Sequence, residues 1–471
     1  MRRHLLLAYS WGFGHIGDTA ITPGMLALLH RQQPDLPVQL LDVLAADHPR
    51  QRESEPYLHQ YSANCRVNAN PFQRLLQADR PESKAMRELI ARWGEQTLLS
   101  FERGCLDSRR AAALADDLLD RLPRELFADL QREQPELAAA FAQAGFVLYS
   151  ASTALSFGRL GVRHLWRRTL LRMMPLLLAR TLGVPYGLNA QSFEALDWPI
   201  ELLYRRLFGD ARFLYCRDSD SLRFLRHKRL AVGGGGGGGF RADSTLFFEG
   251  RDDRRAEAYM AAHGLQAGQF IALMVRIPEV KPGADPIAGS FSERRLAAHM
   301  ELNARFIERW IAETGRKVLL CHESPDTIES AKEHLWRRLS AEARERCVYL
   351  ETFWTTEMAY SLYGRAQMLV GMEIHSVFLA LNAGTPVLHH AFAEAGRKQE
   401  MLRDIGLHDW LFDADTCTAE QLLAAALRIH RNEAEARERL KRLLPRLADG
   451  ANAMLPEVWS NWRTDDAIAG A

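Results

Sequence analysis

Strand-length apolar runs alternate with helix-patterned segments along the first half of the chain. Such runs occur at 4–10, 38–45, 146–153, 185–193 and 212–218. The strands of a parallel sheet are covered on both faces, so they read as nearly unbroken apolar runs, and their alternation with helices is typical of doubly wound α/β domains. We therefore predict a Rossmann-like N-terminal domain over residues 1–250.

The second half of the chain repeats this alternation. Its apolar runs occur at 270–278, 317–324, 347–352, 368–373 and 386–390. The length of 471 residues also exceeds what one ordinary hydrophobic core accommodates. We predict a second Rossmann-like domain over 251–440 and a C-terminal tail over 441–471. The two domains should face a cleft, with ligands at the carboxyl ends of the strands.

Two segments interrupt the alternation in the first half. Residues 72–143 carry helical patterns and no strand candidate, which predicts a helical insertion in the first domain. Seven consecutive glycines occupy 233–239. Because ordering so many glycines costs much backbone entropy, we expect a mobile loop there and not a phosphate cradle.

Composition and charge exclude several classes of protein. The chain has 60 Lys and Arg against 59 Asp and Glu, a net charge of +1 that does not favour nucleic acid as a partner. The six cysteines lie apart without a CxxC pair, so we expect no metal, no cofactor and no disulfide framework, in a reducing cytoplasm. The most hydrophobic stretch, 170–183, is interrupted by arginines and a proline and cannot span a bilayer. A basic amphipathic helix there leaves peripheral membrane contact as an alternative to packing in the core.

Candidate ligand-binding residues follow the predicted strands. Gly14, Gly17 and Asp18 come after the first run, where glycines let a ligand approach the backbone and the next helix offers its N-terminus to an anion. The alternative is a tight turn with Asp18 as the helix N-cap. The other candidates lie at the ends of later runs or in the helix after the last one, and they are Gln191, Arg217, Arg276, Glu323 and Lys398.

Glu373 and His375 stand where the run 368–373 gives way to a helix. If the strand continues through them, both side chains project to the same side. A histidine near a helix N-terminus is suited to acid or base catalysis, so we predict both residues as catalytic. The alternative is structural, with Glu373 as the helix N-cap and His375 bonded to it.

Taken in order, several of these segments resemble the polysaccharide pyruvyl transferase family. The matching pieces are GFGHIGDTAITPGML, PYGLNAQSF, YCRDSDSLRFL, RADSTLFF and the long stretch from GMEIHSVFLALNAGTP to LHDWLFD. The resemblance implies a fold like the two-domain GT-B glycosyltransferases. It also implies transfer of a pyruvyl group from phosphoenolpyruvate to a sugar of a glycan or glycan precursor, as a ketal. Arg217 matches the arginine of the family's RD motif, and His375 matches its C-terminal histidine.

The chain departs from the family at one position of this site. The family has an arginine two residues before the histidine, and this chain has Glu373. With an effective dielectric constant of about 20, a unit charge about 4 Å away contributes ~4 kcal/mol, so the exchange turns attraction for an anionic donor into repulsion. Either Arg276 or Lys398 compensates, or the donor differs, or Glu373 binds a sugar hydroxyl. The sequence thus leaves two rivals, a GT-B glycosyltransferase that uses a nucleotide sugar and a non-catalytic carbohydrate-binding protein.

Overall fold

The computed structural model divides into two compact units. It describes residues 3–10, 12–72, 108–150, 155, 162–196, 201–230, 238–277, 292–392 and 396–463. The first unit comprises Met1–Gly12, Leu28–Asp243 and Gly450–Ala471, and the second comprises Phe13–Ala27 and Ser244–Asp449. The chain therefore contributes one short N-terminal segment to the second unit before it completes the first.

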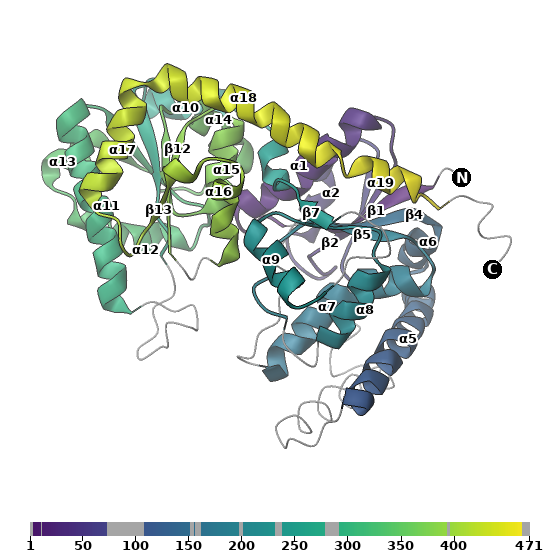
Figure 1. The fold of residues 1–471 in the computed structure, drawn as a ribbon. Coiled ribbons are helices and arrows are strands. Elements are labelled where there is room, and N and C mark those ends of the chain that lie inside the picture. The colour runs from purple at the N-terminus through teal and green to yellow at the C-terminus, as the bar shows by residue number, and fades with distance from the viewer. Residues whose placement is uncertain are drawn as a thin grey trace. The chain divides into compact units, whose positions relative to one another are not determined.

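A seven-stranded parallel sheet forms the centre of the first unit (Figure 1). Its strands are β1 (His4–Ser10), β2 (Val38–Asp42), β3 (Cys65–Asn68), β4 (Ala144–Tyr149), β5 (Tyr186–Gln191), β6 (Leu214–Cys216) and β7 (Gly238–Phe240). They lie in the order β3-β2-β1-β4-β5-β6-β7, and every neighbouring pair is parallel. The direction of winding reverses between β1 and β4, which is the arrangement of a doubly wound sheet.

The helices of the first unit bury apolar stripes against this sheet. They are α2 (Gln51–His59), α5 (Ser108–Glu133), α6 (Pro135–Gln143), α7 (Val162–Thr181), α8 (Glu201–Asp210), α9 (Ser219–His227) and α19 (Leu455–Ser460), with the C-terminal part of α1 (Ile16–Gln32). In α5, Leu119, Leu122, Leu126 and Leu130 recur at helical spacing and are buried in one core with residues of β1 and β4. The predicted helical insertion thus includes α5 and α6, while residues 73–107 lie outside the described residues.

A six-stranded parallel sheet forms the centre of the second unit. Its strands are β8 (Phe270–Met274), β9 (Lys317–Cys321), β10 (Cys347–Tyr349), β11 (Leu369–Gly371), β12 (Val387–Ala391) and β13 (Leu411–Asp413). Their order, β10-β9-β8-β11-β12-β13, reproduces the winding of the first sheet, and all neighbouring pairs are parallel. This confirms the prediction of two Rossmann-like domains.

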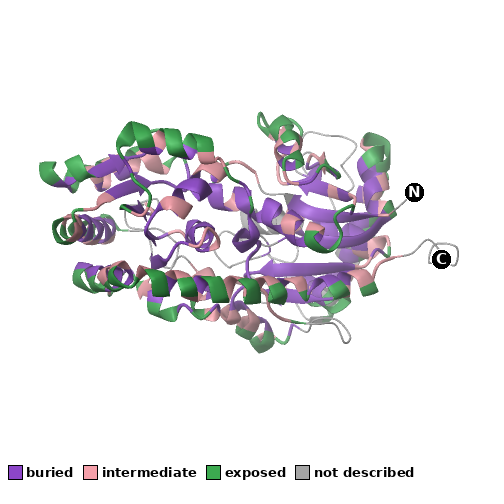
Figure 2. Ribbon diagram, turned by 90° about the horizontal axis from the view of Figure 1, so that it is seen from above, coloured by how far each residue is buried: buried purple, intermediate pink, exposed green. Residues whose placement is uncertain are grey.

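Helices cover the second sheet on both faces. They are α10 (Asp253–His263), α11 (Glu293–Thr314), α12 (Thr327–His334), α13 (Ala341–Arg346), α14 (Thr356–Arg365), α15 (Ile374–Asn382), α16 (Met401–Asp404), α17 (Ala419–Arg431) and α18 (Glu433–Asn452), with the 3-10 turns η2 (Ser244–Phe247), η4 (Trp336–Arg338), η6 (Arg397–Glu400) and η7 (His408–Trp410). In Figure 1, α11 and α17 lie on one side of the sheet and α14 and α15 on the other. Figure 2 shows the central strands of both sheets as buried, with exposed residues along the outer sides of the helices.

The domain boundaries differ from the predicted ones in three respects. The units divide at 243/244, and 13–27 belongs to the second unit, because the start of α1 bonds to residues of that unit. The predicted tail over 441–471 is partly helical, since α18 extends to Asn452 and α19 follows. Leu455 and Val458 of α19 are buried, and the backbone N–H of Arg463 donates to the Gly145 carbonyl at 2.9 Å, which ties this segment to the first unit.

Three short edge strands escaped prediction because they carry no apolar run. They are β3 (CRVN), β7 (GGF) and β13 (LFD). The last two residues of the glycine run, at 238 and 239, belong to β7, while residues 233–237 lie outside the described residues. Among the helices that the structure describes, none has both the length and the apolar character needed to cross a membrane.

Candidate functional site

Several predicted site residues lie at the carboxyl edge of the second sheet. Arg276 follows β8, Glu323 follows β9, and Glu373 follows β11. Strands β8 and β11 are neighbours at the centre of the sheet. The chain continues from β8 towards one edge of the sheet and from β11 towards the other. Ligands of doubly wound proteins bind in the crevice at such a switch point, outside the carboxyl ends of the strands.

Arg276 and Glu373 form an ion pair at this switch point. Arg276 Nε lies 3.2 Å from Glu373 Oε1, and the Arg276 guanidinium lies 5.5 Å from the centre of the Phe392 ring. The two side chains keep 33% and 18% of their exposure, so a ligand can still reach them. Burial raises the pKa of Glu373, and the positive charge of Arg276 opposes this rise only in part. The charge of Glu373 is therefore balanced by a group of the protein itself.

Glu323 caps helix α15 in place of Glu373. Glu373 occupies the N-cap position, but its side chain makes no capping hydrogen bond. Instead, Glu323 Oε2 accepts from the Ser376 hydroxyl at 2.6 Å and from the Ser376 backbone N–H at 3.3 Å. This is the amide that an N-cap side chain usually satisfies. Glu373 is thus the N-cap by position, as the structural alternative has it, but the side chain that satisfies this amide is that of Glu323.

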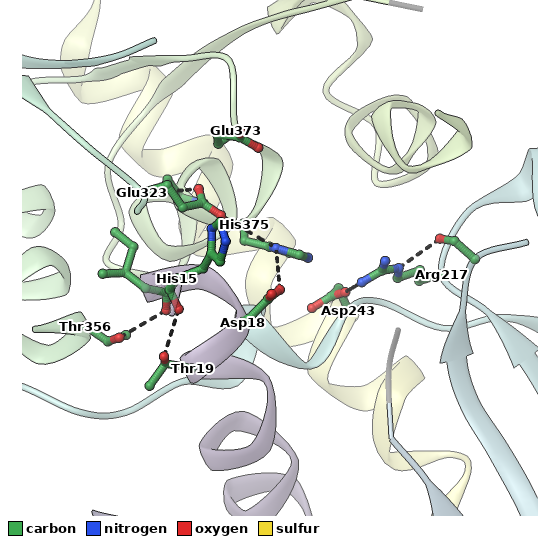
Figure 3. A network of polar contacts seen from close by, with 12 residues as sticks. His15, Asp18, Thr19, Arg217, Asp243, Glu323, Thr356, Glu373 and His375 are labelled. Carbon is green, nitrogen blue, oxygen red and sulfur yellow. Dashed lines mark hydrogen bonds and ion pairs between the residues drawn. The ribbon is translucent and has the colours of Figure 1, made fainter. Parts of the chain in front are cut away.

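His375 lies beside two carboxylates, at the second position of α15 (Figure 3). Its Nδ1 is 3.5 Å from Asp18 Oδ1 and 3.8 Å from Glu323 Oε1. His375 is 7% exposed and Glu323 6%. Burial acts to raise the pKa of Glu323, but the interactions with His375 and the Ser376 hydroxyl outweigh it, so that pKa is lowered. Glu323 is thus a buried carboxylate that remains ionised.

Helix α1 brings Asp18 next to His375, because α1 packs closely against His375 and Glu323 at Gly17. The backbone N–H of Ile16 donates to the Glu323 carbonyl at 3.0 Å. A Cβ on Gly17 would lie 2.2 Å from His375 Cβ and 2.7 Å from Glu323 Oε1, distances that real atoms do not reach. A Cβ on Gly14 would meet nothing within 4 Å. Asp18 lies in the first turn of α1, inside the helix, so it is not the N-cap that the alternative assigned to it.

Two of the predicted residues belong to the first unit and are buried there. Arg217 is 2% exposed; it donates to Asp243 at 2.5 Å and to the Ser192 hydroxyl at 2.8 Å (Figure 3). Gln191 is fully buried and donates to the Asn189 carbonyl at 2.8 Å. Both side chains make hydrogen bonds that hold the carboxyl ends of β5 and β6. These contacts fix the two side chains within the first unit, and their predicted role in substrate binding stays a prediction.

Lys398 and two residues that the sequence analysis missed surround the cluster. Lys398 is half-buried in η6, and its charge acts on Glu373. Ser376 holds Glu323, as described above. His389, in the middle of β12, bonds through Nδ1 to the Gly371 carbonyl at 2.8 Å, and burial lowers its pKa to about 4. The doubled histidine of PVLHH at the end of a predicted strand could have pointed to His389, whereas no sequence signal distinguishes Ser376.

The comparison with known families decides the relationship of the chain. A model of the polysaccharide pyruvyl transferase family matches residues 15–389. This chain belongs to the polysaccharide pyruvyl transferase family. The match includes Asp18, Glu323, Glu373 and His375, and so confirms the resemblance seen in the sequence. No curated protein matches the chain.

Solved structures place this pyruvyl transferase family member among proteins of GT-B type. A putative UDP-N-acetylglucosamine 2-epimerase from Listeria monocytogenes has 11% identity and a TM-score of 0.52, with 98% of this chain and 96% of that chain covered. A UGT transferase from Siraitia grosvenorii has 12% identity and a TM-score of 0.51, with 97% and 100% covered. A UDP-glucosyltransferase from Polygonum tinctorium has 10% identity and a TM-score of 0.51, with 98% and 99% covered. These likenesses confirm the predicted fold.

Proposed function

We propose that the chain transfers a pyruvyl group from phosphoenolpyruvate, or a related enol phosphate donor, to a sugar of a glycan or glycan precursor. The observation that carries this proposal is the placement of His375. It stands at the N-terminus of α15 beside two carboxylates, next to a switch point that carries Arg276. Membership of a transferase family supports the same reaction.

The chemistry needs an acid, a base and cations. Protonation of the donor's methylene carbon makes the adjacent carbon electrophilic, and one sugar hydroxyl bonds to that carbon. The C–O bond to phosphate then breaks with its electron pair leaving on phosphate, and a second hydroxyl closes the ketal. One of the two hydroxyl protons replaces the proton consumed at the methylene carbon, and the other leaves with phosphate. His375 is the group placed to move these protons, and acid–base catalysis of this kind contributes on the order of 10²–10⁴-fold.

Two cations are assigned to the donor's negative charges. Arg276 can present its planar guanidinium to a carboxylate or phosphate, and Lys398 adds a second positive charge whose field acts on Glu373. In this proposal the donor competes with Glu373 for Arg276. Gly14 and the start of α1 remain proposed contacts of the ligand, whereas Gly17 serves the approach of α1 to His375.

A second candidate is transfer from a nucleotide sugar, and the Arg276–Glu373 pair is the observation that favours it. Because its guanidinium is already paired with Glu373, Arg276 attracts phosphoenolpyruvate, which carries both a phosphate and a carboxylate, less than a free arginine does. A partly exposed carboxylate at a switch point can accept hydrogen bonds from sugar hydroxyls. A carbohydrate-binding protein without catalysis would keep the same contacts.

A ligand panel separates the three functions. Thermal unfolding is measured with phosphoenolpyruvate, nucleotide sugars and free sugars, because a ligand that binds only the folded state stabilises it, by about 2.7 kcal/mol at a hundred times its Kd. Pyruvylation of a sugar that binds is then followed by mass spectrometry for the wild type and for His375→Ala. We expect stabilisation by phosphoenolpyruvate and turnover that His375→Ala lowers without a change in circular dichroism. Stabilisation by nucleotide sugars alone, or by free sugars without turnover, would replace the proposal with the corresponding rival.

A further inference from the structure

The two oxygens of Glu323 have different surroundings. Oε2 accepts from the hydroxyl and the backbone N–H of Ser376, so only hydrogen-bond donors face it. Oε1 faces His375 Nδ1 at 3.8 Å, and the same nitrogen lies 3.5 Å from Asp18 Oδ1. Two carboxylates from different segments therefore face one ring nitrogen.

We propose that Glu323 is a positioning residue which, with Asp18, holds the neutral imidazole of His375 as its Nδ1–H tautomer. Negative charge beside Nδ1 favours the tautomer that directs an N–H dipole towards it, and the lone pair is then carried by Nε2. Nε2 is thus the atom that exchanges a proton with the substrate. The catalytic part of this inference rests on the proposed function, whereas the tautomer itself does not.

Rigid contacts keep Glu323 from serving as a ligand for substrate. The Glu323 carbonyl accepts from Ile16, and its side chain is 6% exposed with one oxygen occupied by Ser376. The absence of a side chain at Gly17 lets α1 close over the same carboxylate. The sequence analysis predicted Glu323 as substrate-binding, and the geometry assigns it instead to the orientation of His375.

Three carboxylates from different segments act on His375. Asp18 comes from α1, Glu323 follows β9, and Glu373 precedes α15 and interacts electrostatically with His375. His15 also acts on Glu323, and a positive charge on it would favour the ionised carboxylate. Arg276 pairs with Glu373.

The variant Glu323→Gln makes a sharp test because its amide can satisfy Ser376 in only one orientation. The Ser376 backbone N–H can only donate, so the amide oxygen must take the place of Oε2. The amide NH₂ then stands where Oε1 stood and directs a donor at Nδ1. A donor facing Nδ1 disfavours the Nδ1–H tautomer, so we expect the neutral ring to change to Nε2–H.

The experiment is nitrogen-15 NMR of the full chain labelled at histidine, at a pH where the imidazoles are neutral. We expect His375 as Nδ1–H in the wild type and mainly as Nε2–H in Glu323→Gln. Ser376→Ala is the matched control, because it removes the hydroxyl contact and keeps the carboxylate, so the tautomer should not change. His389 is an internal reference, since its Nδ1 bonds to the Gly371 carbonyl.

The wild-type spectrum alone can overturn the inference, even if the variant fails to fold. An Nε2–H tautomer in the wild type refutes it, and so does an unchanged tautomer in folded Glu323→Gln. In the pyruvylation assay, we expect Glu323→Gln to lower kcat by on the order of 10²–10⁴-fold with KM within a few-fold. Wild-type protein that shows the Nδ1–H tautomer but no pyruvyl transfer would refute the proposed function and leave the tautomer assignment intact.

Discussion

Replacing Glu373 with glutamine tests whether the ion pair at the switch point opposes an anionic donor. Arg276 Nε lies 3.2 Å from Glu373 Oε1. At an effective dielectric constant of about 20, the Coulomb attraction over that distance is roughly 5 kcal/mol, before the cost of desolvating both groups. Both side chains are partly exposed, so the net value is closer to the ~1.5–3 kcal/mol of a charge-assisted hydrogen bond. A donor that competes for Arg276 has to overcome this amount.

Glu373→Gln should therefore tighten phosphoenolpyruvate binding by on the order of 10–100-fold, since about 1.4 kcal/mol corresponds to a factor of ten. Isothermal titration calorimetry measures the affinity of both proteins after circular dichroism has shown that they fold alike. Glu301→Gln is the matched control, because it removes an exposed carboxylate paired with Arg305 in α11 and should not change the affinity.

The opposite result would refute this reasoning. If the wild type binds phosphoenolpyruvate tightly and Glu373→Gln weakens it, then Glu373 orients Arg276 for the donor and does not compete with it. If the natural ligand is a neutral sugar, the same variant should weaken sugar binding, because an amide accepts hydroxyl hydrogen bonds less strongly than a carboxylate does. Glu373→Arg would place two guanidinium groups side by side and is a less specific test.

Two further predictions concern stability. Gly17→Ala should cost about 1–3 kcal/mol in urea unfolding, because its Cβ would overlap His375 and Glu323, whereas Gly14→Ala should be nearly neutral; equal effects would contradict the close approach of α1. Burial lowers the pKa of His322 from 6.5 to about 4, so the unfolded chain binds this proton first as the pH falls. As the pH falls from 6.5 to about 4, His322 should therefore lower the free energy of unfolding, by up to about 1.4 kcal/mol per pH unit. His322→Phe should flatten the dependence of the free energy of unfolding on pH in that range. A profile with the same slope in both proteins would show that His322 titrates normally in the folded state.

The two-domain fold could be predicted because its buried strands appear in the sequence as unbroken apolar runs. The run HLLLAYS became β1 without change, and the runs of the second half became β8 to β12. The predicted strands were often too long, as at 38–45, where β2 ends at Asp42. An apolar run that continues past the end of a strand into a buried loop looks the same in the sequence as a run that stays in the hydrogen-bonded strand throughout.

The candidate site was only half predictable, for a physical reason. Placement at strand ends follows from the alternation, and it identified Arg276, Glu323, Glu373 and His375. The partners of these side chains are set by packing between distant segments, as for Arg276 and Glu373, which are 97 residues apart. Arg217 illustrates the same point, because an arginine at a strand end can also form a buried ion pair, here with Asp243, and its predicted role in substrate binding stays a prediction.

The side chain at position 373 is not needed to cap α15. The first turn of a helix has backbone N–H groups that need acceptors, and the N-cap side chain usually supplies one. Here that acceptor is Glu323, so the side chain at 373 carries no capping duty and is available to Arg276. We therefore expect a substitution at 373 to change the charge at the switch point and to leave the helix that positions His375 intact. Glu323 has no such freedom, because its one carboxylate both caps this helix and faces the histidine.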